Sequence, residues 1–132
     1  MKAQELMIGD WVRTPIDFEN GAYVYDIDRI SSINEYDAFS TSEFDMCGDV
    51  ADLLPVPLTA EILEKNFAKR LFFDGEFEGY SYVTDGMQID QLADSVFVWI
   101  CPGTINGILS LRYVHELQHA LRLCGIEKEI QL

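Results

Sequence analysis

Three dipeptides that favour tight hairpin turns lie between β-prone segments of this chain: Asn20-Gly21, Asp74-Gly75 and Asp85-Gly86. Asn-Gly and Asp-Gly tolerate the positive φ angles of the two-residue turns that match the twist of paired antiparallel strands. Strands joined in this way are neighbours in the chain and in the sheet. The sequence therefore predicts antiparallel sheet in both halves of the chain.

Residues 1–58 are typical of a bent β subdomain. A strand is expected to start after Gly9-Asp10 and to stop at Pro15, and two or three short strands are expected between residues 31 and 58. Residues 22–30 alternate, so we expect one apolar side in the core and one polar side in water, with Tyr23, Tyr25 and Ile27 on the first and Asp26 and Asp28 on the second. A small, bent antiparallel sheet or an SH3-like barrel fits this pattern.

Residues 59–132 combine helices and a β-meander. Thr59 can cap a short helix that ends near Asn66, and strands are expected over residues 77–83, 87–92 and 96–101. A long final helix is expected from Gly107 to Cys124, capped by Asn106 and stopped by Gly125, where Ile126 can fold back on Leu121. The prediction is an α+β fold in a single domain, residues 1–132, because this length suits one core.

The final predicted helix carries the string His115-Glu116-Leu117-Gln118-His119. Two histidines four residues apart share one helical face and can hold Zn²⁺, while the adjacent glutamate can take a proton from metal-bound water. A zinc-dependent hydrolase, with His115 and His119 as metal ligands and Glu116 as the catalytic base, is therefore one hypothesis for the function.

Three features of the sequence disfavour that hypothesis. The apolar stripe centred on Leu117 places both histidines on the opposite, solvent-facing side, where Arg112 and Arg122 would flank a bound cation. The chain contains only 2 histidines, so a third ligand would have to be a carboxylate or a thiol. The extended zincin pattern also requires glycine at the position of Arg122. We therefore expect no catalytic residue, metal or cofactor, with zinc as the alternative.

The net charge of −14 restricts the partners of this protein. Residues 1–58 carry a net charge of −9, residues 59–106 carry −5, and residues 107–132 are neutral. Direct binding to nucleic acid or to an anionic membrane is disfavoured, because both depend on Lys and Arg. A basic protein partner, or imitation of DNA to inhibit a nucleic-acid-binding protein, agrees with the charge.

Other constellations are weak. Asp26 with Asp28, and Asp74 with Glu76 and Glu78, place carboxylates on common strand faces but lack the spaced loop of an EF-hand. The odd number of cysteines, 3 in all, favours reduced and mostly buried thiols, and no apolar run or export signal opposes a cytoplasmic location. Eight aromatic residues are more than one small core needs: Trp11, Tyr23, Tyr25, Phe72, Phe73, Tyr80, Tyr82 and Trp99. Most are expected in the core, and a few that are exposed together would form a partner-binding patch.

Three segments, KAQELMIGDWV, LLPVPLTAEILEKNF and LRYVHELQHALRLCGIEKEI, resemble a family of small proteins from Bacteroides-type gut bacteria and their phages or mobile elements. In the family pattern the final helix has a Y-V-H-x-L-Q-N form, with asparagine at the position of His119. The resemblance implies that the shared motif is His115 with Leu117 and Gln118, which is not a zinc signature. It brings no activity, cofactor or partner.

These observations favour a non-catalytic protein-interaction module whose partner is another protein or a second copy of the chain. Zinc hydrolysis and DNA mimicry are the alternatives.

Overall fold

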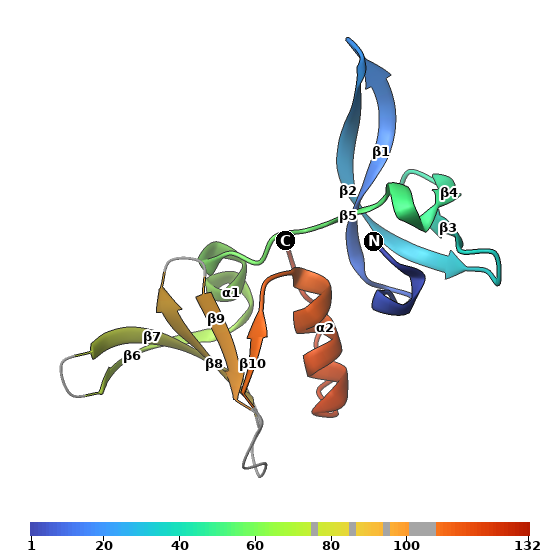
Figure 1. The fold of residues 1–132 in the computed structure, drawn as a ribbon. Coiled ribbons are helices and arrows are strands. Elements are labelled where there is room, and N and C mark those ends of the chain that lie inside the picture. Colours follow the sequence, from blue (N-terminus) through green and yellow to red (C-terminus); the bar gives the residue numbers. More distant parts are fainter. Residues whose placement is uncertain (75–76, 85–86, 94–95, 101–107) are drawn as a thin grey trace. The chain divides into compact units, whose positions relative to one another are not determined.

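The computed structural model describes residues 1–74, 77–84, 87–93, 96–100 and 108–132 (Figure 1). It contains two α-helices and two antiparallel five-stranded sheets in these residues, which confirms the α+β class. The chain divides into two compact units, unit 1 from Met1 to Val56 and unit 2 from Pro57 to Leu132. The single-domain organisation stays a prediction. None of the described helices has the length and apolar character needed to span a membrane.

Unit 1 is an open sheet with strand order β4-β3-β2-β1-β5, so β4 and β5 form its edges. Its elements are η1 (Ala3–Glu5), β1 (Trp11–Glu19), β2 (Ala22–Ile33), β3 (Ala38–Thr41), β4 (Cys47–Asp49), η2 (Val50–Asp52) and β5 (Leu54–Pro55). The three short strands after β2 agree with the sequence prediction. The SH3-like barrel stays a prediction.

The first two strands form a long ribbon that extends past the other strands of unit 1 (Figure 1). Glu19 pairs with Ala22 across the Asn20-Gly21 turn, where φ is 51° and 80°, as the sequence predicts. Contrary to prediction, β1 continues through Pro15. A bulge between Pro15 and Asp17 absorbs the proline, whose missing N–H is tolerated where no third strand needs it.

The core of unit 1 forms at the base of the ribbon. Val12 and Ile30 are buried there with other apolar side chains: Leu6, Phe39, Val50 and Leu53. The predicted inward side was wrong, because Tyr23 and Ile27 are exposed and Asp28 is buried. Alternation places 23, 25 and 27 on one side of β2, but it cannot tell which side the rest of the unit covers.

Unit 2 contains a meander with strand order β10-β9-β8-β7-β6. Its strands are β6 (Ala68–Asp74), β7 (Phe77–Thr84), β8 (Met87–Ala93), β9 (Val96–Ile100) and β10 (Ile108–Leu111). The three predicted strands are confirmed, and one further strand lies on each side of them. The side chains of Tyr82, Met87, Ile89 and Phe97 are buried.

Two helices accompany this sheet, with α1 (Ala60–Asn66) beside β6 and α2 (Val114–Leu123) beside β10. Thr59 caps α1 as predicted, since its hydroxyl accepts the N–H of Ile62 at 3.3 Å. The predicted helix from Gly107 was wrong over residues 108–111, which pair with β9 as a strand. The predicted cap Asn106 lies outside the described residues.

The ends of α2 and of the chain are fixed by hydrogen bonds. Gly125 has a φ of 70°, and the N–H of Ile126 donates to the carbonyl of Leu121 at 2.9 Å, which confirms the predicted Schellman ending. The Asn66 amide exchanges two 2.7 Å hydrogen bonds with the backbone of Gln131, in the manner of a strand partner. The last residues are thereby attached to α1.

Candidate functional site

The His-Glu-x-x-His string lies at the start of α2 rather than in the middle of a long helix. His115 is only 6% exposed, so the prediction that both imidazoles face solvent was wrong for this residue. Its ring stacks against the Tyr113 ring, with centroids 5.7 Å apart, and meets the His119 ring edge-on at the same centroid distance. His115 thus belongs to a ring cluster at the first turn of α2.

Glu116 serves the backbone. Its Oε2 accepts the N–H of Arg112 at 2.6 Å and the N–H of Tyr113 at 3.2 Å, immediately before the helix. A carboxylate at the third helical position caps N–H groups that have no intrahelical partner. Glu116 therefore has a structural role that accounts for its place in the string.

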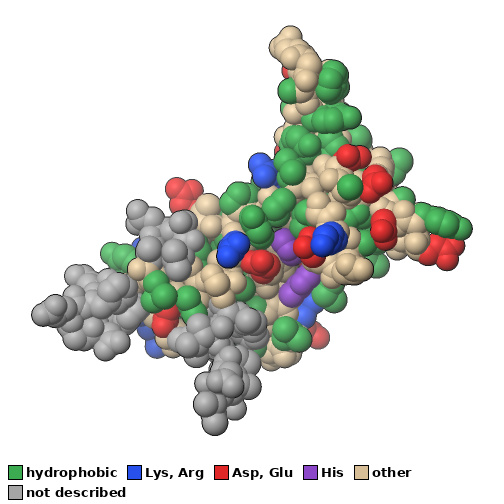
Figure 2. Space-filling model, viewed as in Figure 1, with side chains coloured by type: hydrophobic (Ala, Val, Ile, Leu, Met, Phe, Trp, Pro, Cys, Tyr) green, Lys and Arg blue, Asp and Glu red, His purple; other side chains and the backbone are tan. Residues whose placement is uncertain are grey.

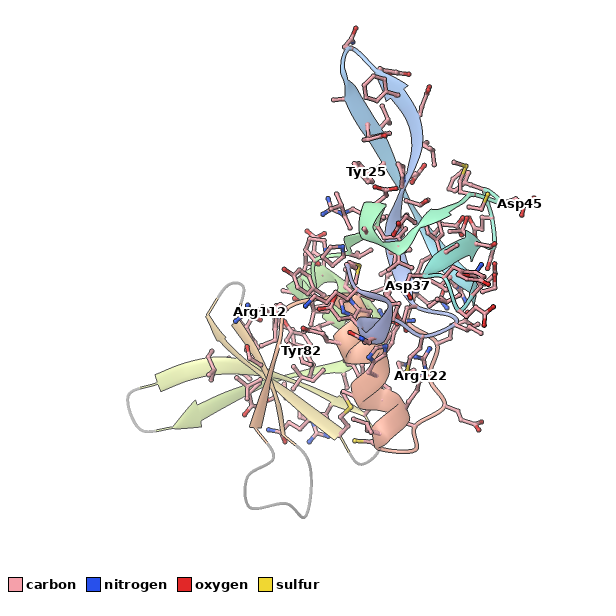
Figure 3. The ribbon with its side chains drawn as sticks, turned by 45° about the vertical axis from the view of Figure 1, so that its right-hand side comes forward. Tyr25, Asp37, Asp45, Tyr82, Arg112 and Arg122 are labelled. Atoms are coloured by element: carbon pink, nitrogen blue, oxygen red, sulfur yellow. The ribbon has the colours of Figure 1, made fainter. Side chains whose placement is uncertain are left out.

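The two arginines that flank the histidines differ in position (Figure 3). The sequence analysis predicted both arginines on one face of a helix. Arg112 instead precedes α2, and only Arg122, in its last turn, is part of the helix. Among the residues that the structure describes, no group of three or more His, Cys, Asp or Glu side chains could hold a metal ion. The zinc hypothesis stays untested, and the geometry supplies no argument for it.

The ribbon of unit 1 has one aromatic side. Register places Phe18 opposite Tyr23 and Pro15 opposite Tyr25, and residues 23, 25 and 27 alternate onto the same side. The rings contact one another, with centroids 5.1 Å apart for Phe18 and Tyr23 and 6.4 Å for Tyr23 and Tyr25. We call this surface the aromatic face, made of Pro15, Phe18, Tyr23, Tyr25 and Ile27.

The aromatic face is open to solvent. Phe18 and Tyr23 are each 59% exposed, Ile27 is exposed, and Tyr25, labelled in Figure 3, is half-buried. Figure 2 shows hydrophobic side chains gathered along the ribbon. A contiguous exposed apolar patch is typical of an interaction site, whereas single exposed apolar residues are ordinary.

The opposite side of the ribbon is acidic toward its tip. Asp17, Glu19 and Asp26 alternate onto this side and are exposed. Asp28 lies on the same side at the base, where it is fully buried. The ribbon is therefore aromatic on one side and anionic on the other over its outer half.

Asp28 is buried as a hydrogen-bonded carboxylate. Its oxygens accept the N–H groups of Glu43, at 3.0 and 3.2 Å, and of Phe44, at 2.9 Å. Burial acts to raise the pKa of Asp28, but the bonds from Phe44, Glu43, the Thr41 hydroxyl and Arg29 together hold this pKa below its ordinary value of 3.8. Asp28 thus fixes the turn of residues 42–46 against β2, so it is structural rather than part of a carboxylate pair with Asp26.

The cavity, the other carboxylates and the cysteines are weaker candidates for a functional site. A shallow cavity of about 300 Å³ in unit 1 has two carboxylates in its wall, but Asp49 already accepts the N–H of Ala51 at 2.8 Å as the cap of η2. The three carboxylates of Asp74, Glu76 and Glu78 lie at or beside residues that the structure does not describe, and Cys101 is itself outside the described residues. Cys47 is exposed and Cys124 is half-buried, so the prediction of mostly buried thiols was wrong for Cys47.

Comparison with known proteins adds no identification. No protein family, curated protein or solved structure matches this chain. The resemblance to small proteins of gut bacteria and their phages is therefore still a prediction, and so is DNA mimicry.

The sequence pointed to part of this site. Tyr23 and Tyr25 were among the aromatic residues in excess of core needs, and Ile27 was predicted on the same side of the strand, but Phe18 was not recognised as their neighbour. The signal was present in the turn: a two-residue Asn20-Gly21 connection pairs Glu19 with Ala22 and therefore Phe18 with Tyr23. The side chains of Phe72, Phe73 and Trp99 lie outside the description.

Proposed function

We propose that this protein is a non-catalytic protein-binding module that contacts its partner through the aromatic face of the β1–β2 ribbon. The single observation that carries the proposal is the exposure of Phe18 and Tyr23, 59% each, within a contiguous cluster of contacting rings. Large aromatic side chains dominate the energy of protein interfaces, since they bury much area with few rotatable bonds.

The shape of the site favours a protein over a small molecule. Small ligands are held in concave pockets that surround most of their surface, whereas the aromatic face is one side of a two-stranded ribbon. A two-stranded hairpin is by itself only marginally stable in water, so a partner that covers its apolar side would stabilise it. The ring contacts already order Phe18, Tyr23 and Tyr25, which lowers the entropy lost on binding.

Site-specific photocrosslinking tests the proposal. A benzophenone amino acid replaces Tyr23 in the full chain, and the matched control carries it at Tyr36, a tyrosine of the same unit that is 81% exposed on the β2–β3 turn. We expect a discrete crosslinked protein from position 23 and none from position 36. Adding Phe18→Ala should abolish that product.

The captured protein is then purified and titrated against the intact chain. Phe18→Ala should weaken binding by about 10- to 100-fold, the effect of removing a central aromatic anchor, and Tyr36→Ala should leave it unchanged. Equal products from positions 23 and 36, or products that do not depend on Phe18, would contradict the proposed function.

A further inference from the structure

The edges of the ribbon are blocked by its own carboxylates. The Asp17 Oδ1 accepts the N–H of Phe18 at 2.7 Å, and the Asp26 Oδ1 accepts the N–H of Ile27 at 2.7 Å. One of these pairs lies on β1 and the other on β2, and within residues 1–56 neither Thr14–Glu19 nor Ala22–Ile27 pairs with a third strand.

An added strand would need free backbone donors along one of these edges. Here two donors are occupied, and the occupying groups are charged, which is how natural edge strands resist pairing. Strand addition is therefore disfavoured on both edges, by a partner or by a second copy of the chain. The aromatic face is left as the docking surface.

The charge of the ribbon around the aromatic face favours a cationic partner. Between Thr14 and Asp28 the chain has no Lys or Arg, while Asp17, Glu19 and Asp26 are exposed. The two arginines of the ribbon lie at its base, where the Arg13 Nε donates to the Pro55 carbonyl at 3.0 Å. The Asp17 and Asp26 side chains start on the opposite side of the ribbon, but their hydrogen bonds to the N–H groups of Phe18 and Ile27 hold both carboxylates at its edges, which border the aromatic face. These edges are anionic, so an acidic partner or a phosphate backbone would be repelled.

The same side of the ribbon already displays the contact that such a partner would make. The Arg29 guanidinium lies 4.4 Å from the centroid of the Trp11 ring, and register places this pair on the side that carries Tyr25 and Tyr23. Aromatic faces attract cations, and a planar, weakly hydrated guanidinium stacks on them better than an ammonium group. The exposed rings of Tyr23 and Phe18 continue this side toward the tip, where the Asp17 carboxylate lies at the edge beside Phe18.

We infer that the partner presents an arginine-rich extended segment, which docks on the aromatic face with its guanidinium groups over the rings and beside the carboxylates of Asp17 and Asp26 at the edges of the ribbon. The inference rests on the proposed function and specifies the chemistry of the partner. It also specifies the mode of binding, across the face of the ribbon rather than along its edge.

A peptide titration tests the inference on the intact chain. A short peptide of alternating arginine and glycine is added to the ¹⁵N-labelled protein, and amide shifts are followed by NMR. Matched peptides carry lysine, or citrulline, which keeps the planar group and removes the charge. We expect saturable shifts concentrated at residues 15–27, weaker binding of the lysine peptide, and at least about tenfold weaker binding of the citrulline peptide.

Variants separate the aromatic contribution from the charge. Phe18→Ala with Tyr23→Ala should abolish saturable binding, whereas Tyr36→Ala should not. Asp17→Asn with Asp26→Asn should weaken binding by about fivefold or more, and Glu35→Gln with Glu43→Gln, on other turns of unit 1, by less. Unchanged amide shifts in the rest of each free variant verify that it is folded.

Three outcomes would overturn the inference. Equal affinity for the arginine and citrulline peptides would remove the role of charge, and shifts spread over every acidic turn would show unspecific attraction. Intermolecular cross-strand contacts at Phe18 or Ile27 would show edge addition instead. If Phe18-dependent crosslinking persists while the peptide does not bind, the arginine-rich partner is wrong and the protein-binding function stands.

Discussion

Asp28 shows how a single buried charge is accommodated in unit 1. Its carboxylate receives the N–H groups of Glu43 and Phe44 and lies on the same side of β2 as the buried Ile30. An uncompensated carboxylate would be costly there, but multiple donors stabilise the charged form. The attachment of the turn after β3 to strand β2 therefore depends on the ionised state of Asp28.

This dependence predicts an acid-sensitive unit. Because the folded-state pKa of Asp28 is lower than 3.8, its contribution to stability is present above the ordinary pKa and disappears as the pH falls below about 4 through the folded value. Asp28→Asn should lower the free energy of unfolding by about 1–3 kcal/mol at pH 7, since an amide group would face the N–H donors. Urea titrations at several pH values measure both effects.

The control is Glu35→Gln, which removes an exposed carboxylate from the β2–β3 turn of the same unit. It should leave the stability at pH 7 nearly unchanged. If Asp28→Asn and Glu35→Gln behave alike, the hydrogen bonds to Asp28 do not stabilise the fold.

At the scale of elements, Glu116 determines where α2 begins. Removing its carboxylate by Glu116→Ala should expose the N–H groups of Arg112 and Tyr113 and destabilise the start of α2 by about 1 kcal/mol. Glu116→Gln keeps an acceptor oxygen and should cost less than half as much. Amide hydrogen exchange of residues 117–121 measures the difference.

The two variants separate the capping role of Glu116 from the role of catalytic base that the zinc hypothesis gives it. A catalytic base is lost in both variants, whereas a cap is lost mainly in the alanine variant. Equal destabilisation by Glu116→Ala and Glu116→Gln would mean that the carboxylate charge, and not its acceptor geometry, holds the start of α2.

Local signals predicted the local parts of this fold. The Asn20-Gly21 turn, the Thr59 cap and the Gly125 ending were predictable because each depends on the conformation of a few adjacent residues. Non-local pairing was not predictable: residues 108–111 have an apolar run that suits a helix or a strand, and only pairing with β9 decides between them.

The candidate site was predictable to the same extent. The excess of aromatic residues indicated an exposed patch. The register set by the Asn20-Gly21 turn would have identified the neighbouring residues that form it. Which side of β2 is covered depends on where the segments after β2 return, and alternation within the strand carries no information about that. Tyr23 and Tyr25 were therefore predicted for the core.

For the whole molecule, the dominant property is its net charge of −14, of which residues 1–58 carry −9. Like charges oppose the compact state, and their repulsion acts over distances comparable to the Debye length, about 10 Å at 0.1 M salt. Most carboxylates of unit 1 are exposed on turns and on the ribbon, where ions can screen them.

Salt should therefore stabilise the protein. Raising sodium chloride from about 20 to about 200 mM should raise the midpoint of thermal unfolding by a few degrees, because the 23 acidic residues outnumber the 9 basic ones and screening therefore weakens repulsion more than attraction. Neutralising three exposed acids, Glu35→Gln, Glu43→Gln and Asp45→Asn, should reduce this salt response. A midpoint that falls with salt would show that attractive pairs outweigh the repulsion.

Salt should act in the opposite direction on binding. The carboxylates of Asp17 and Asp26 at the edges of the ribbon attract a cationic segment through charges that ions also screen, so affinity for the arginine peptide should fall over the range in which the protein becomes more stable. A loss of binding in salt could then not arise from unfolding of the ribbon. The opposite signs of the two responses separate the electrostatics of the fold from the electrostatics of the aromatic face.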